Sequence, residues 1–234
     1  MNRINYIRQE EKKYHNLCYE QYKLFEAGSW LYKPVKTVMD LMMDHFEGKN
    51  NLQVLDLGSG VGRNSIPIAQ KIQNTSGTVT CVDLLDSALT KLQTYSKEYG
   101  VINNIKTEQA AIENYYIQPN TYDYIVAVSS LEHVKSIEDL TCVLHSMKKG
   151  TKTGGINCLI INSNIQEIDL HTNEELDALI EINLPTDDMI DLLKSIYKEW
   201  QKIKVEIKEL AYDIVRNERH IQLKTNAITF VVQK

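Results

Sequence analysis

The sequence predicts an α/β fold with a mainly parallel sheet that is covered by helices on both faces. Short apolar runs alternate with amphipathic helical patterns as far as residue 162, and strands that take turns with helices form parallel sheets. A cluster of glycines directly follows the first apolar run, and two strand-like runs with a short polar connection end the chain. The sheet is therefore expected to begin parallel and to end in an antiparallel hairpin.

The size and charge of the chain limit the classes of function. Its 234 residues, 43% of them hydrophobic, suffice for one domain with an appendage. The net charge of −5 leaves no basic stripe for a phosphate backbone, so we expect no nucleic-acid partner. A polar N-terminus and the lack of an apolar run of about 18 residues predict a cytoplasmic protein without a membrane partner. We expect a monomer or a homodimer.

The cysteines predict free thiols and no metal site. Their spacing matches neither CxxC nor a metal-binding pattern. Thiols in apolar runs are typically buried, which agrees with a reducing compartment. The cysteines are Cys18, Cys81, Cys142 and Cys158.

The first strand is predicted at 52–57, where a short apolar run ends in glycines. The following helix must begin close to these glycines, because Pro67 is tolerated only in the first turn of a helix. A second strand is expected at 77–83, and the helix after it ends at Gly100.

Further strands at 104–110, 122–130 and 154–162 complete the parallel part of the predicted sheet. Between the last two, Ser136 and Asp139 resemble a capping box, which predicts the start of a helix. In the tail, threonines that resemble N-caps (Thr172 and Thr186) precede helical patterns at 173–183 and 187–199. Period-two alternation then predicts strands in KIKVEIKEL and RHIQLKTNAITFVVQK, joined by the polar segment DIVRNER.

The front of the chain is expected to be a separate helical segment, residues 1–48, ahead of the ligand-binding domain, residues 49–234. Residues 3 to 26 combine charge with tyrosines, and a helix is predicted at about 34–47. No strand anchors residues 3 to 32 in the sheet, so we expect a mobile lid that closes over a ligand. Trp30 is the aromatic residue of this lid expected near the ligand.

The glycine stretch VLDLGSGVGRNS distinguishes between classes of ligand. It lacks the GK[ST] ending of a nucleotide-binding P-loop, and Arg63 stands where G-x-G-x-x-G would have its third glycine. Asp56 at the strand end suits a ligand with cationic amino and sulfonium groups and would repel a pyrophosphate. A second acid, Asp83, follows 27 positions later, where a carboxylate can accept both hydroxyls of a ribose. These features favour S-adenosylmethionine.

With these residues, the chain resembles the class I S-adenosylmethionine-dependent methyltransferases. VLDLGSGVGRNS is similar to their first motif, CVDLLDSAL to the ribose-binding motif, YDYIVAVSSLEHV to the fourth strand, and KTGG to the turn before strand five. The resemblance implies a Rossmann-like seven-stranded sheet, parallel except for an antiparallel C-terminal strand. Within the family, the GRNS sequence and the last strands resemble the tellurite-resistance methyltransferases of TehB type. The His-Arg pair of those proteins falls on Tyr212 and Asp213 here.

The resemblance also implies a set of cofactor residues. Adenine would rely on backbone groups at the third strand's end, beside Glu113, and Leu84 would cover an adenine face or belong to the core. The implied cofactor residues are Asp56, Gly58, Ser59, Gly60, Asp83, Leu84, Ala111, Ile112 and Ser129.

The candidate catalytic residues are Glu132 and His133, which follow the fourth strand at the edge where open α/β sheets bind ligands. The alternative interpretation is that they cap the next helix. We expect a small acceptor, held between the front segment, residues 130–133 and residues 163–185. His133 would be the base for a thiol or hydroxyl acceptor. An anionic acceptor would be held by Arg216, Arg219 or His220.

Two other functions agree with the same glycine loop. A nicotinamide-dependent oxidoreductase would also place glycines between a strand and a helix, although Arg63 and the terminal hairpin disfavour it. A non-catalytic protein that binds S-adenosylmethionine would keep every motif described above, because methyl transfer from a sulfonium requires no obligatory side chain.

Overall fold

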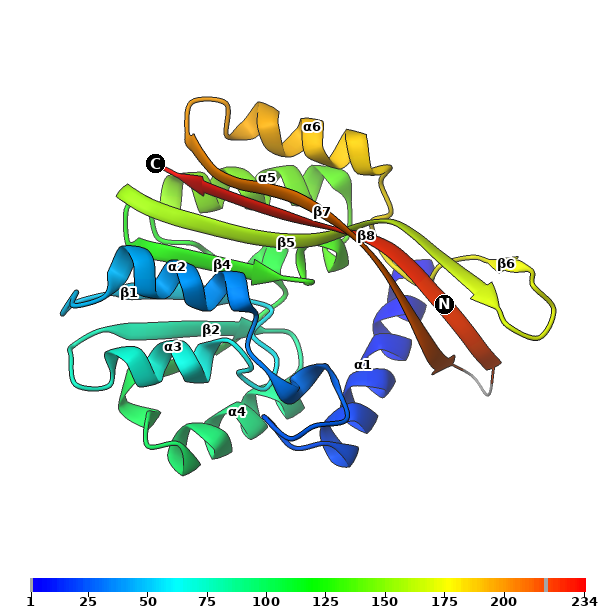
Figure 1. Cartoon of the computed structure of the whole chain (residues 1–234), viewed down its shortest axis with the longest axis horizontal. Coiled ribbons are helices and arrows are strands. Elements are labelled where there is room, and N and C mark those ends of the chain that lie inside the picture. Colours follow the sequence, from blue (N-terminus) through cyan, green and yellow to red (C-terminus); the bar gives the residue numbers. More distant parts are fainter. Residues whose placement is uncertain (1, 217–218) are drawn as a thin grey trace.

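The protein is described by a computed structural model that covers residues 2–216 and 219–234. Its strands form one sheet in the order β3-β2-β1-β4-β5-β8-β7, with β6 paired to the end of β5 (Figure 1). The strands are β1 (Gln53–Leu57), β2 (Thr78–Asp83), β3 (Ile105–Gln109), β4 (Tyr122–Val128), β5 (Thr151–Asp169), β6 (Glu175–Leu176), β7 (Gln201–Arg216) and β8 (Arg219–Gln233).

The direction of the strands confirms the predicted topology. Strands β3, β2, β1, β4 and β5 pair in parallel, whereas β8 runs antiparallel to both β5 and β7. Because the connected strands are parallel, the loops that follow β1, β2, β3 and β4 meet at one edge of the sheet. This carboxyl edge positions the candidate site.

Helices cover both faces of the sheet, as predicted. One face packs against α2, α3 and α4, and the other against α5 and α6; the inward side chains alternate along β1, where Val54 faces the first group and Leu55 the second. The helices are α1 (Arg3–Gln21), α2 (Lys36–Phe46), α3 (Ser65–Ile72), α4 (Asp86–Glu98), α5 (Ile137–Gly150) and α6 (Thr186–Ile196). Short 3₁₀ turns are η1 (Trp30–Tyr32), η2 (Ile102–Asn104), η3 (Ile112–Asn114) and η4 (Leu131–His133).

The N-terminal helix α1 lies across the carboxyl edge rather than on a face of the sheet (Figure 1). Its Asn16 accepts a hydrogen bond of 2.6 Å from Ser87 in α4, and Glu11 contacts Arg216 in β7 at 3.4 Å. Tyr19 from α1 is buried in the same apolar cluster as α2 and α3. The helix therefore joins the two ends of the carboxyl edge.

The helix predicted at 173–183 is wrong. This segment contains a turn, the short strand β6 and extended chain. Thr172 does not cap a helix, because its N–H donates to Asp169 and its hydroxyl accepts from Glu174 within a tight turn. The apolar residues that follow, Ala178, Ile180 and Ile182, are buried at every second position, which is the period of extended chain. The alternation of buried residues therefore determines the extended conformation of this segment, although Thr172 resembles a helix cap.

Strands β5 and β7 are longer than predicted, whereas β8 matches the predicted range closely. Strand β5 continues to Asp169, and DIVRNER belongs largely to the hairpin, since β7 reaches Arg216 and β8 begins at Arg219. The expected turn itself falls on residues 217–218, which lie outside the described residues. The outer parts of β5, β7 and β8 (residues 163–169, 210–216 and 219–226) extend past the carboxyl edge, and we call them the arm (Figure 1).

Several other expectations agree with the structure. Ser136 caps α5 by accepting a hydrogen bond of 3.1 Å from the backbone of Asp139. Cys18, Cys81 and Cys158 are buried free thiols, whereas Cys142 is exposed on α5, contrary to the expectation of burial. Among residues 2–216 and 219–234, no helix combines the length and the apolar character that a membrane crossing requires.

We predict that Gly62→Ala destabilises the protein more than Gly100→Ala. Both glycines have positive φ, +96° and +72°, so alanine is strained at each. A Cβ at Gly62 would also overlap Leu92 and lie 2.9 Å from Ile66, whereas Gly100 faces open space. Urea unfolding should give losses of about 2–4 kcal/mol for Gly62→Ala and about 1 kcal/mol for Gly100→Ala. Equal losses would contradict the close packing of the glycine loop against α4.

Candidate active site

The glycine loop after β1 is hydrogen-bonded to the end of β2. The N–H groups of Gly58 and Ser59 donate to the carbonyl of Val82 at 2.8 and 3.0 Å, and the N–H of Gly60 donates to the Asp83 carboxylate at 2.8 Å. The other oxygen of Asp83 accepts from Leu85 at 2.8 Å. Burial raises the pKa of Asp83 above its ordinary value, against the opposing effect of these backbone donors. Asp83 thus fixes the shape of the loop and keeps unused lone pairs for a ligand.

The loop is also held from the side of β4. A Cβ atom at Gly58 would overlap the Cβ of Ser130, and the Ser130 hydroxyl donates to the carbonyl of Leu57 at 2.7 Å. Gly60 lies on the other side, where a Cβ atom would stand 3.3 Å from the Tyr19 hydroxyl of α1. The open side of the loop therefore faces α1.

Asp56 has a supporting position beneath the loop. Its carboxylate is buried and accepts a hydrogen bond of 2.5 Å from the hydroxyl of Ser65, at the start of α3. Burial raises the pKa of Asp56 to about 6, although the bond from Ser65 opposes the shift. This carboxylate was predicted to face a cationic ligand, and in the structure it bonds to Ser65 of α3.

Aromatic side chains from the front segment gather against the loop. The rings of His15 and Tyr19 lie 5.7 Å apart, and both contact the ring of Trp30 edge-on at 5.9 and 6.3 Å. Arg63, directly after the last glycine of the loop, stacks over Trp30 at 5.2 Å and donates to its carbonyl at 3.0 Å. Trp30 thus lies beside the loop and links it to α1.

Three buried polar atoms at the carboxyl edge have no hydrogen-bond partner among the described residues. They are the Ser59 hydroxyl in the glycine loop, Oε2 of Glu132 in η4, and Nδ1 of His15 in α1. Unpaired buried polar groups are unfavourable and uncommon in folded proteins. We call the region that they mark, between α1 and the ends of β1, β2 and β4, the edge site. Its donors and acceptors suit a polar ligand with amino and hydroxyl groups.

The remaining predicted ligand residues lie around the same edge. Leu84 is 44% exposed at the end of β2, so it is not a core residue. Ala111 is buried at the start of η3, and Ile112 is half-buried beside it. The N–H of Ser129, at the end of β4, donates to Ile160 at 2.7 Å. Glu113 is already engaged by Arg8 at 2.8 Å and by Lys135 at 3.3 Å.

Glu132 and His133 do not cap α5, because Ser136 has that role. Glu132 is buried, and one of its oxygens accepts from the Asn162 side chain at 2.5 Å and from the Asn162 backbone at 3.2 Å. Burial raises the pKa of Glu132 above its ordinary value. His133 is half-buried, and its Nδ1 lies 3.0 Å from Oε2 of Glu181.

Glu181 is a site residue that the sequence analysis missed. Its carboxylate is almost fully buried, at 1% exposure, between His133 and α1. Burial disfavours the charged form of His133, but the bond to Glu181 and the charges of Glu11, Glu132 and Glu181 raise the pKa of His133 to about 9. The sequence ELDALIEI has the alternation of an extended segment, with Glu181 between two buried isoleucines, but it was interpreted as a helix.

The three residues proposed to hold an anionic acceptor lie in different environments in the structure. Arg216 pairs with Glu167 of β5 at 2.5 Å and with Glu11 of α1 at 3.4 Å. Burial alone would raise the pKa of Glu11, but the His15 hydrogen bond and the charges of His133, His15 and Arg216 lower it to about 2. Arg219 and His220 are exposed on the arm.

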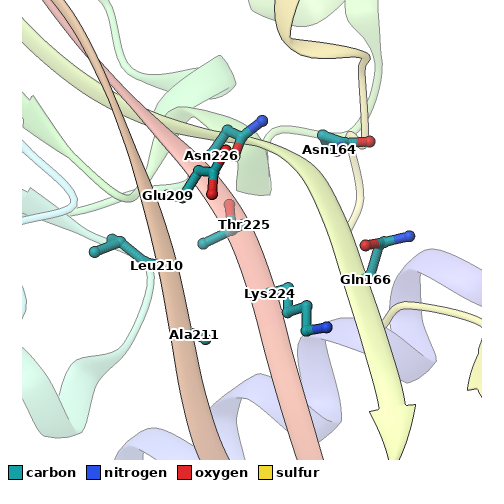
Figure 2. Close-up of a pocket in the computed structure, with 8 residues that line it drawn as sticks. All are labelled: Asn164, Gln166, Glu209, Leu210, Ala211, Lys224, Thr225 and Asn226. Atoms are coloured by element: carbon teal, nitrogen blue, oxygen red, sulfur yellow. The ribbon is translucent and has the colours of Figure 1, made fainter.

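A hollow of about 510 Å³ lies on the arm, among three strands (Figure 2). Its charged members, Glu209 and Lys224, are exposed to solvent. Asn226, which lines the hollow, donates to Thr186 at the start of α6. The lining residues are Asn164, Gln166, Glu209, Leu210, Ala211, Lys224, Thr225 and Asn226, none of which belongs to the edge site. In the part of the chain that is described, no cluster of His, Cys, Asp and Glu side chains is arranged to hold a metal ion.

We predict that the His133–Glu181 pair makes stability fall as pH rises from about 6.5 to 9. A histidine whose folded pKa is raised stabilises the protein fully below its unfolded pKa of 6.5, and this stabilisation is lost as pH rises through about 9. After allowance for solvent screening, the change should be about 1–2 kcal/mol. His133→Gln should flatten this part of the pH dependence in urea unfolding, and His145→Gln, on the exposed side of α5, should not. Identical slopes in both variants would contradict the pairing.

The comparisons with known proteins agree with this geometry. Residues 54–155 match the family described as "Methyltransferase domain". A ubiquinone biosynthesis O-methyltransferase of Rickettsia felis is 26% identical over 77% of this chain and 72% of its own length. A ubiquinone/menaquinone biosynthesis C-methyltransferase of Blochmanniella pennsylvanica is 31% identical over 41% of this chain and 37% of its own. Among solved structures, TehB from Haemophilus influenzae superposes with a TM-score of 0.62 at 21% identity, over 86% of this chain.

The chain spans 62% of that TehB chain, less than two thirds of it. This likeness shows the fold, and the family match covers the glycine loop, Asp83, and the Glu132 and His133 pair. The predicted fold and cofactor class are confirmed, and the oxidoreductase alternative is set aside. Residues 54–155 thus match a methyltransferase domain, and the chain is similar in sequence and in fold to S-adenosylmethionine-dependent methyltransferases.

Proposed function

We propose that the protein transfers a methyl group to a hydroxyl of a small-molecule acceptor in the edge site. One observation carries the proposal: the unpaired buried atoms of Ser59, Glu132 and His15 gather at the carboxyl edge, beside the His133–Glu181 pair. A binding site and a group able to take up a proton therefore lie together. S-adenosylmethionine supplies an activated methyl group on a sulfonium, so positioning provides much of the rate.

The cofactor would lie along the ends of β1, β2 and β3. Asp83 has lone pairs left after binding Gly60 and Leu85, and these would accept the ribose hydroxyls. Leu84 is exposed enough to cover an adenine face, and backbone groups at Ala111 and Ile112 would contact the adenine edge. Ser59 would bind the amino-acid end of the cofactor. Gly58, Asp56 and Ser129 would shape this part of the site without a direct contact.

The His133–Glu181 pair favours an acceptor that loses a proton on methylation. Because Nδ1 of His133 bonds to Glu181, Nε2 is the nitrogen able to face an acceptor. A phenol has a pKa of about 10, so its proton passes to a histidine with a pKa of about 9 at little cost. An anionic acceptor is less favoured, because Arg216 is already neutralised by Glu167 and Glu11.

The relatives support the same choice of acceptor atom. The Rickettsia felis O-methyltransferase aligns over 77% of the chain, whereas the C-methyltransferase aligns over 41%. The longer alignment therefore includes more of the chain outside the family match at residues 54–155. We further propose that α1 serves as the lid. The cytoplasmic location and the monomeric or dimeric state remain predictions.

Asp83→Ala should weaken binding of S-adenosylhomocysteine, measured by calorimetry. The change removes the acceptor proposed for the ribose and the bond that fixes Gly60, so the expected loss is about 1–3 kcal/mol. Asp86→Ala is the matched control, because Asp86 is an exposed carboxylate in the first turn of α4. Unchanged affinity in Asp83→Ala would refute the ribose assignment.

His133→Ala should lower turnover of a hydroxyl acceptor by about 10²- to 10⁴-fold with little change in cofactor affinity. The acceptor is first identified with labelled S-adenosylmethionine across phenols, thiols, amines and oxyanions. In the parent protein, kcat/KM should rise with pH to a midpoint near 9, and Glu181→Gln should move this midpoint down, because it removes a charge that raises the pKa of His133. His171→Ala, at an exposed position in the turn between β5 and β6, is the control. A parent rate in His133→Ala would exclude this residue as the base.

A further inference from the structure

Arg8 of α1 bridges two parts of the edge site that are far apart in the sequence. Its Nη2 donates to Glu113 at 2.8 Å and to the backbone carbonyl of His133 at 3.3 Å, and its Nε donates to Glu181 at 3.3 Å. Glu113 follows β3, where the adenine is proposed to bind, and Glu181 is the partner of His133. One guanidinium therefore connects the cofactor end of the site with its acceptor end.

The bonding pattern of Glu181 makes this connection specific. Its Oε1 accepts from Arg8, and its Oε2 faces Nδ1 of His133. The side chains of Glu113 and Glu181 are 4% and 1% exposed, so solvent has little access to either carboxylate. A planar guanidinium can bind two carboxylates in fixed directions, which an ammonium group cannot do.

A second arginine of the same helix provides an internal comparison. Arg3 binds the same segment, through Asp177 at 3.1 Å and through the carbonyls of Ala178 and Ile180 at 2.9 and 3.0 Å. It has no bond to Glu181 or His133. Arg3 therefore binds α1 to residues 177–180, and of the two arginines only Arg8 contacts His133.

We propose that Arg8 is a positioning residue for methyl transfer: it holds Glu181 against Nδ1 of His133 and ties this pair to the loop after β3. The inference rests on the proposed role of His133. When α1 is seated, Arg8 fixes the carboxylate that orients the imidazole, and Nε2 then faces the acceptor. Arg8 itself touches neither the acceptor nor the transferred methyl group.

The protonation of His133 distinguishes positioning from a simple charge effect. The groups that act on the imidazole are Glu181 from the extended segment, Glu132 from its own turn and Glu11 from α1. Loss of a nearby cation would by itself raise the pKa of His133. Loss of the group that holds Glu181, and of the contact that seats α1 with Glu11, removes carboxylates from the imidazole and lowers this pKa. The two roles therefore predict opposite signs.

The test is an NMR titration of His133 in the full chain, with labelled histidine and His133→Gln for assignment. Arg8→Ala should lower the pKa of His133 by about one pH unit or more, and Arg8→Lys should restore it only in part. Arg3→Ala should leave it unchanged. A raised or constant pKa in Arg8→Ala, or an equal fall in Arg3→Ala, would overturn the proposal. Circular dichroism and urea unfolding of each variant show whether it remains folded.

Activity forms a separate arm of the experiment. With an acceptor from the screen, Arg8→Ala should lower kcat by about tenfold or more and move the pH midpoint of the rate downward, as Glu181→Gln does. If His133→Ala retains the parent rate, the proposed function fails while the titration still decides the role of Arg8. If His133→Ala loses activity but Arg8→Ala keeps the parent pH midpoint and rate, the positioning role alone fails.

Discussion

The site depends on the hydrogen bonds that join the glycine loop to the end of β2. Two N–H groups of the loop share the carbonyl of Val82, and a third binds Asp83. These bonds form because β1 and β2 are parallel neighbours, so the turn after one strand lies beside the end of the other. They direct the Ser59 hydroxyl and the Asp83 lone pairs to the same edge. Without this constraint the loop would be a flexible turn with no defined ligand geometry.

The second layer of the site is electrostatic and comes from α1. This helix brings Arg8 and Glu11 to an edge that already carries Glu113, Glu181, His133 and Arg216. The side chains of Glu113 and Glu181 are buried and the others are partly buried, so the charges are stabilised by pairing. The pairs connect α1 with several separate parts of the chain, and they explain why a polar helix packs at the carboxyl edge. Seating of α1 and the charge state of His133 are consequently linked.

The sequence predicted those features that depend on residues close in the chain. Pro67 and Gly100 marked helix ends, Ser136 marked a cap, and Asp83 followed its strand at the expected spacing. The cap-like Thr172 belongs to a turn, so the helix predicted behind it was wrong and the role of Glu181 in that extended segment was not predicted. Arg8 was not predictable, because its contact with His133 joins positions 125 residues apart and α1 shows no clear apolar face.

The central claim is that the edge site holds S-adenosylmethionine, and a crystal structure with S-adenosylhomocysteine tests it most directly. The account predicts the ribose hydroxyls on Asp83, the adenine beside Ala111 and Ile112, and the amino-acid end at Ser59, so that the unpaired hydroxyl of Ser59 gains a partner. The homocysteine sulfur should lie on the side of His133. A ligand in the hollow of the arm, or one that leaves Asp83 and Ser59 without contact, would contradict the account.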